Sequence, residues 1–281
     1  MRKVLLAIIT ASAVVRAELP EKAPPESREQ VATALRALRP MLRAQSSLES
    51  AILAYAPGRF HPVDEGVLPQ THATAATCPT GMADVAHRFC IDKWEGSLVE
   101  KRADGTEAPW SPFQTPEPGH VYVAHTSAGV VPQAYISASQ AQAACHAAGK
   151  RLCAAVEWRA ACGGSQSNAF PYGPQRVARK CHDTGVAPAI ALHVSDLNDP
   201  RLNQMQDTIA KTGEFADCVN DYGVYDMVGN VHEWTSDTNG TFQGGYWLDT
   251  SEHGDGCAYR TIAHDYSYHD YSTGFRCCAD L

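Results

Sequence analysis

YGVYDMVGNVHEWT, residues 222–235, is the most informative stretch of the chain. Within it, short apolar and aromatic segments alternate with Gly, Asn and Asp, the residue types that favour turns. The same alternation runs through most of the chain after Gly164, and no internal repeat appears. We therefore expect short strands and long ordered loops, which need cross-links to hold them in place.

Three segments before Gly164 carry clearer secondary-structure signals. Residues 78–85 and 88–95 are typical of the two strands of a small hairpin, which a Cys78–Cys90 disulfide would pin. Residues 136–149 contain serines for an N-terminal cap and end at a glycine, which predicts a helix. A second helix is predicted over residues 154–162, stopped by two glycines.

Cysteine content and charge narrow the class of protein. The chain has ten cysteines, an even number, and no Cys-x-x-Cys pair. Thiols in this number rarely persist in a reducing cytosol unless they bind metal, so disulfides and an oxidising compartment are expected. The formal net charge is −8 and no basic cluster is present, which disfavours nucleic acid as a partner.

The first residues of the chain predict its cellular compartment. Residues 1–17 combine a basic start, an apolar run and small residues near Ala17, the pattern of a secretory signal peptide. The alternative is a buried N-terminal helix. The apolar run is shorter than the roughly 20 residues of a membrane-spanning helix, so no transmembrane anchor is expected. We predict a secreted or periplasmic protein.

Residues 18–77 differ in composition from residues 78–281. A Pro-rich leader precedes apolar residues at helical spacing from Val31 to Leu53, interrupted by Pro40, and residues 57–77 resemble a linker. We interpret the middle part as two short amphipathic helices. Their apolar face either packs on the main domain or binds a protein partner. The main domain is expected over residues 78–281.

Four segments of residues 78–281 resemble, in order, the formylglycine-generating enzyme or sulfatase-modifying factor family. They read AAGKRL (147–152) with EW (157–158) and AAC (160–162), FPYG (170–173), YGVYDMVGNVHEWT (222–235), and GGYW (244–247) with TGFRC (273–277). The third segment is the most specific, because so long a match is hard to obtain by chance. The resemblance implies an α+β fold of the C-type-lectin-like kind with little regular secondary structure.

The resemblance also implies most of the disulfide pattern. By family position, Cys145 pairs with Cys277 and Cys162 pairs with Cys257. These assignments leave Cys153 for Cys278 and Cys181 for Cys218.

A calcium site is implied by the same resemblance. In the family, the segment equivalent to residues 225–233 wraps a Ca²⁺ ion, which prefers oxygen ligands. The expected ligands are the side chains of Asp226 and Glu233 and the carbonyls of Gly229 and Val231. The alternative is a metal-free loop held by its own hydrogen bonds.

The cysteine pair that performs oxidation in the family is missing. Formylglycine formation resembles a copper(I) reaction in which two thiolates hold the metal, and these lie after the GGYW-like segment, about five residues apart. Asp249 stands where the first thiol belongs, and the next cysteine is Cys257, which resembles a structural cysteine of the family. His232 replaces a tryptophan in the third motif. Copper is therefore not expected, and Cys257, His232 and Asp249 are weak catalytic candidates.

Histidines and carboxylates near the last two motifs offer a different metal chemistry, since imidazole and carboxylate suit Fe, Zn or Cu(II). The histidines are His232, His253, His264 and His269. Three functions stay open: a binding module with a groove for a peptide or small-molecule ligand, an oxygen-dependent oxidase with a rebuilt metal site, and an accessory maturation factor. We favour the binding module.

Overall fold

A computed structural model describes residues 68–69, 77–185 and 196–281. The predicted signal peptide and amphipathic helices lie outside the described residues. Within the described part, no helix is long and apolar enough to cross a membrane.

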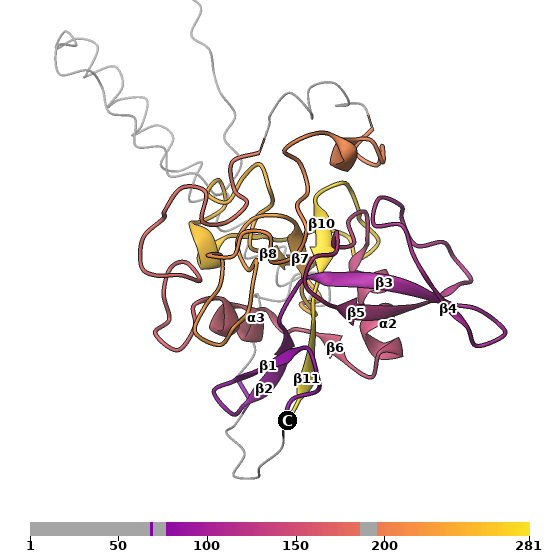
Figure 1. Ribbon diagram of the computed structural model, residues 1–281, viewed down its shortest axis with the longest axis horizontal. Helices are drawn as coiled ribbons and strands as arrows, with labels where there is room; N and C mark the ends of the chain where they lie inside the picture. Colours follow the sequence, from indigo (N-terminus) through magenta and orange to yellow (C-terminus); the bar gives the residue numbers. More distant parts are fainter. Residues whose placement is uncertain (1–67, 70–76, 186–195) are drawn as a thin grey trace, which may run out of the picture. The chain divides into compact units, whose positions relative to one another are not determined.

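Short strands and a few helices make up the regular structure (Figure 1). The strands are β1 (Met82–Val85), β2 (Phe89–Asp92), β3 (Gly96–Lys101), β4 (Glu107–Pro109), β5 (Val121–Thr126), β6 (Arg151–Leu152), β7 (His232–Trp234), β8 (Phe242–Gln243), β9 (Arg260–Thr261), β10 (Thr273–Phe275) and β11 (Cys277–Asp280). The helices are α2 (Ala138–Ala147) and α3 (Ala155–Cys162), with 3₁₀ turns at Leu202–Gln204 and Gly256–Ala258. This is the α+β fold with sparse secondary structure that the sequence predicts.

The strands form three small sheets. Their strand orders are β1-β2-β11-β6, β10-β7-β8-β9 and β4-β3-β5. In the first sheet, β11 pairs antiparallel with both β2 and β6, so segments far apart in the sequence meet beside it (Figure 1). In the second, β10 runs parallel to β7, with Thr273 opposite His232. The third sheet packs against α2.

Local sequence signals account for the predicted hairpin and both helices. Ala86 and His87 have φ of +53° and +55°, and the Arg88 amide donates to the carbonyl of Val85 at 3.0 Å, which gives the tight turn between β1 and β2. Ser137 caps α2 in a capping box with Gln140. The predicted hairpin and helices are therefore confirmed, with the helices slightly shorter than expected.

Five disulfides cross-link the domain and join the partners named from the sequence. They are Cys78–Cys90, Cys145–Cys277, Cys153–Cys278, Cys162–Cys257 and Cys181–Cys218. Adjacent side chains of a strand point to opposite faces. Cys278 accordingly packs in a core cluster with Trp158, whereas Cys277 packs in another with Trp234. β11 thus separates two hydrophobic cores and is bonded into both.

Candidate functional site

The loop before β7 is tightly folded, because several of its residues adopt backbone angles that L-amino acids rarely take. The angle φ is +57° at Asp226, +85° at Gly229 and +59° at Asn230. The amide of Gly229 donates to the carbonyl of Gly244 at 2.9 Å, and a side chain at Gly229 would collide with the carbonyl of His182. Glycine therefore allows three segments of the chain to meet here.

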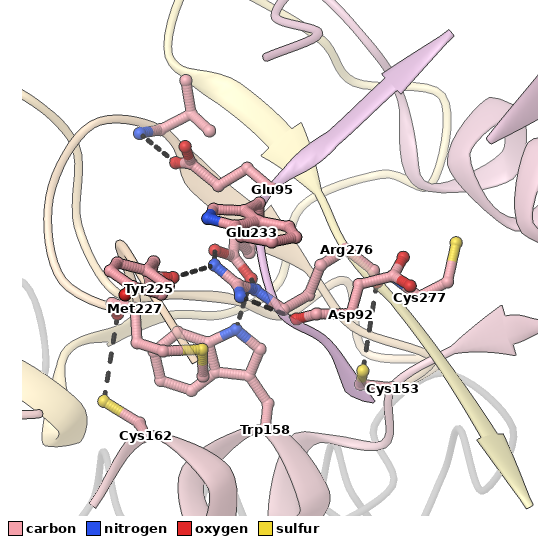
Figure 2. Close-up of polar contacts among 12 residues, drawn as sticks. Asp92, Glu95, Cys153, Trp158, Cys162, Tyr225, Met227, Glu233, Arg276 and Cys277 are labelled. Atoms are coloured by element: carbon pink, nitrogen blue, oxygen red, sulfur yellow. Dashed lines mark hydrogen bonds and ion pairs between the residues drawn. The ribbon is translucent and has the colours of Figure 1, made fainter. Parts of the chain in front are cut away.

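Arg276 and Glu233 form a buried ion pair at the centre of this region (Figure 2). Nε and Nη2 of Arg276 each lie 2.6 Å from a carboxylate oxygen of Glu233. The guanidinium also donates to the carbonyls of Asp92 at 3.1 Å and Tyr225 at 2.9 Å. Trp158 Nε1 donates to Glu233 at 2.6 Å. One arginine between β10 and β11 thus connects β2, β7 and the loop before β7.

Two further carboxyl groups are buried close to this ion pair. Glu95 accepts a hydrogen bond from Asn230 Nδ2 at 2.7 Å, and Asp226 accepts one from the Gly213 amide at 2.6 Å. Burial raises the pKa of Asp226 to about 7. Burial also raises the pKa of Glu95 well above its usual range, and the charges of Asp226 and Glu233 add to this shift. Three carboxyl groups therefore surround one guanidinium.

Asp249 uses its carboxylate to close the loop in which it lies. Its Oδ1 accepts from the amides of Ser251 at 2.9 Å and Glu252 at 3.1 Å, and its Oδ2 accepts from the Tyr259 hydroxyl at 3.0 Å. Partial burial opposes ionisation, but these hydrogen bonds outweigh it and hold the pKa of Asp249 below its usual value. The carboxylate is thus ionised and already well supplied with donors.

His232 extends this chain of contacts into the core. Its Nε2 lies 3.4 Å from the Tyr259 hydroxyl, and its Nδ1 lies 3.0 Å from Ser272 Oγ. Ser272 Oγ donates its only hydrogen to Asp270 at 2.7 Å, so it accepts from His232 and Nδ1 carries the imidazole hydrogen. Burial lowers the pKa of His232 to about 3, which keeps the ring neutral. Asp249, Tyr259 and His232 are therefore brought together.

Cys257, the third catalytic candidate, is bonded to Cys162. The described residues include all ten cysteines of the chain, and none of them is a free thiol.

The histidines singled out from the sequence do not converge on one point. The ring of His253 packs against Tyr259 at 5.7 Å, and that of His264 packs against Phe242 at 4.4 Å. His269 Nδ1 is 2.7 Å from Asn198 Oδ1. Throughout the described ranges, no group of three or more His, Cys, Asp and Glu side chains could hold a metal ion. The sequence prediction of a transition-metal site among these histidines finds no support in this arrangement.

Comparison with known proteins identifies the domain. The model of the sulfatase-modifying factor enzyme 1-like domain matches residues 70–281. The chain belongs to this family. It is also similar to the formylglycine-generating enzymes of Mus musculus, with 35% identity, and Bos taurus, with 34% identity, in each case over 108 residues. These matches cover 38% of this chain and 27% of either enzyme, so the matched part is about a quarter of the curated relatives.

Solved structures resemble the chain more distantly. The Major Tropism Determinant I1 variant is 15% identical with a TM-score of 0.46, over 73% of this chain and 54% of that protein. CarF is 17% identical with a TM-score of 0.42, over 80% of this chain and 95% of CarF.

The donor chemistry of the site fits the calcium ion expected for a sulfatase-modifying factor domain. Asp226 and Glu233 are both buried and lie at the two ends of one loop, with Gly229 and Val231 between them. Glu233 is also paired with Arg276, and burial favours the neutral forms of Asp226 and Glu95; a divalent cation at these oxygens would instead favour the carboxylates.

Sequence reasoning missed Glu95, Arg276 and Tyr259 as members of the site. A signal for Arg276 was available, because it lies inside the TGFRC segment and a buried arginine requires a carboxylate partner. Glu95 and Tyr259 carried no comparable signal, since neither lies in a quoted motif and their positions depend on long-range packing.

Proposed function

We propose that the chain is an exported sulfatase-modifying factor domain that acts by binding a ligand or peptide and has no copper-dependent cysteine oxidase activity. The single observation that carries this proposal is the state of the cysteines. All ten are paired in five disulfides, whereas copper(I) oxidation of a cysteine needs two thiolates close together.

The residues around Asp249 support the same proposal. At the position of the first expected thiol, a carboxylate is bonded to its own loop and to Tyr259. These contacts fix a mostly buried polar cluster made of side chains that are not soft metal ligands, with only Asp249 partly exposed. Such a cluster holds the loop around Asp249 in a fixed shape but does not supply the thiolate pair that suits copper(I).

Export is supported by the cross-links. Five disulfides in one domain are characteristic of proteins that fold in an oxidising compartment, and the basic and apolar start of the chain is consistent with a signal peptide. We therefore include a secreted or periplasmic location in the proposal.

We also propose calcium at the loop before β7. Asp226 and Glu233 would contribute carboxylate oxygens, and Gly229 and Val231 main-chain carbonyls. Bound there, calcium supplies a hard cationic cross-link and no redox chemistry. Its role is to fix the loop against the segments that contain His182 and Gly244.

The test combines a thiol count, metal analysis and turnover. The mature protein is purified without reductant, denatured, and treated with a thiol reagent; a native sample is loaded with copper(I), dialysed and analysed for metal. Oxygen uptake is measured with a panel of cysteine peptides, with the Mus musculus formylglycine-generating enzyme as the positive control. We expect no free thiol, no retained copper and no oxygen uptake.

A different outcome would identify an oxidase. Two free thiols that include Cys257, together with retained copper and oxygen-dependent aldehyde formation, would overturn the proposal. The variant Cys257→Ser distinguishes the cases, because it abolishes turnover in a Cys257-dependent oxidase. In a binding module it breaks only the bond to Cys162.

A further inference from the structure

A groove of about 410 Å³ runs between α2 and the segment that enters β5. One wall is formed by residues 116–122 and the other by α2. None of the lining residues belongs to the network of Asp249, Tyr259 and His232. The volume is in the range of sites for small molecules and short peptide segments.

The wall opposite α2 is held in place by hydrogen bonds and a ring contact. Gln140 Nε2 of α2 donates to the carbonyl of Pro116 at 2.8 Å, and the Glu117 amide donates to the Tyr122 hydroxyl at 3.0 Å. Tyr122 in turn packs edge-on against Trp110 at 4.9 Å. With prolines at 116 and 118, this wall has little freedom to collapse onto the helix. The groove is therefore preformed, which lowers the entropic cost of binding.

The α2 side of the groove is short and is lined by three alanines together with Ser139 and Gln140. Ala143 and Ala147 are exposed, and together with Ala144 they leave room that larger side chains would fill. The lining stretch of α2 runs from Ser139 to Ala147, which at 1.5 Å per residue spans about 12 Å. An extended peptide of about four residues has this length.

Carboxylates outnumber cations at the groove. The side chain of Glu117 is 64% exposed, and His120 lies between Glu117, at 3.8 Å, and Glu100, at 2.5 Å. On β3, Glu100 pairs with Tyr122 and Lys101 pairs with Val121; Lys101 itself is not among the residues that line the groove. The ionisable groups that line the groove are thus Glu117, His120 and the Tyr122 hydroxyl, and Glu100 contacts His120 beside it.

We propose that this groove binds an extended peptide segment of about four residues that carries a lysine or arginine. The aliphatic stem of that side chain packs on Ala143 and Ala147, and its cationic head contacts Glu117. The inference rests on the proposal that the domain acts by binding, and it adds a place and a ligand chemistry. Small apolar residues on either side of the cation suit the alanine-lined wall.

The experiment measures fluorescence anisotropy of a labelled peptide with the full-length mature protein. The probe is acetyl-Ala-Val-Lys-Val-Ala, and its counterpart carries Glu in place of Lys. The variant Ala143→Leu fills the groove, and Glu117→Gln removes charge with little change of shape. Gln142→Leu is the matched control, because it adds the same side chain to an exposed position of α2 that does not line the groove.

We expect the lysine peptide to bind more tightly than the glutamate peptide. Ala143→Leu weakens binding about tenfold or more, Glu117→Gln removes most of the preference for lysine, and Gln142→Leu changes neither. Melting temperatures show whether each variant is folded, and Glu117→Gln keeps the test valid if Ala143→Leu unfolds. Absence of binding by both peptides, or equal binding of the two, would overturn the proposal. Lysine-peptide binding that a folded Ala143→Leu variant leaves unchanged would exclude this groove and leave the binding function intact.

Discussion

Arg276 is fully buried, and its guanidinium meets the carboxylate of Glu233 through two contacts of 2.6 Å. The pair connects the TGFRC segment to the YGVYDMVGNVHEWT segment, so two motifs that lie about 40 residues apart form one unit.

We predict that Arg276→Ala destabilises the domain by about 3–5 kcal/mol, because it leaves buried carboxylates without their cation. Arg201→Ala is the control: Arg201 also pairs with an aspartate, Asp199, but its side chain is 71% exposed. The control variant should cost much less, because an exposed ion pair contributes little to stability. Urea unfolding of the three proteins measures both values, and equal losses would contradict the assigned role of burial.

Substitutions at Gly240 and Gly105 allow the cost of backbone strain to be distinguished from the cost of a steric collision. Both have positive φ, +67° and +82°. A Cβ atom added at Gly240 would collide with the carbonyl of His264, whereas no atom lies within 4 Å of a Cβ atom added at Gly105. We expect Gly105→Ala to cost about 1 kcal/mol and Gly240→Ala clearly more, with part of the sheet edge near His264 disturbed. Thermal unfolding of both variants measures the difference.

The disulfides should contribute according to the loops that they close. Cys145–Cys277 closes a separation of 132 residues, and Cys78–Cys90 closes one of 12. Chain entropy predicts about 5 kcal/mol for the first and about 3 kcal/mol for the second. Paired Cys→Ala variants, compared by urea unfolding, should therefore differ by about 2 kcal/mol. The reverse order would show that native packing around the bonds outweighs loop closure.

Removal of calcium should destabilise the wild-type domain. We expect EGTA to lower the melting temperature, and we expect Asp226→Ala to abolish the effect of EGTA because the loop then lacks one side-chain oxygen ligand. Calorimetry with and without added Ca²⁺ measures both. An unchanged melting temperature for wild type with EGTA would indicate that the loop is held by hydrogen bonds alone.

The lowered pKa of His264 makes the stability of the domain depend on pH in a predictable direction. Burial lowers the pKa of His264 below its ordinary value of about 6.5, and the charge of Asp270 only partly opposes this shift. The folded state therefore binds the proton less well than the unfolded state, and stability falls as the pH drops below about 6.5. NMR titration, with the resonance assigned through His264→Gln, should give a midpoint below that value. The same variant should make the loss of stability in acid less steep, with the remaining slope due in part to His232, whose pKa is also lowered.

The sequence predicted most of the local structure and the family of the domain. The Ser137 cap and the stop at Gly149 predicted α2 because these signals act within a few residues. The placement of Asp249 was also predictable from its distance to the GGYW segment. Its partners were not, because Tyr259 reaches it through a 3₁₀ turn that no short-range pattern indicates.

The histidines show the opposite case. His232, His253 and His264 lie near one another in the sequence. In the fold, however, each ring packs against an aromatic side chain, and the three rings do not meet. Composition indicates which metal-binding groups are present, whereas convergence depends on side-chain directions that only the fold determines.

Two of the disulfides, Cys78–Cys90 and Cys145–Cys277, limit how far tension can extend the chain. With Cys78–Cys90 and Cys145–Cys277 intact, a force applied across the domain passes from one bond to the next and can extend only the roughly 55 residues between them, about 190 Å. After reduction, all of the roughly 200 residues from Cys78 to Cys277 could extend, to a length of about 700 Å. The loops that contain Glu233, Asp249 and Tyr259 lie inside the closed ring, so tension along the chain does not reach them.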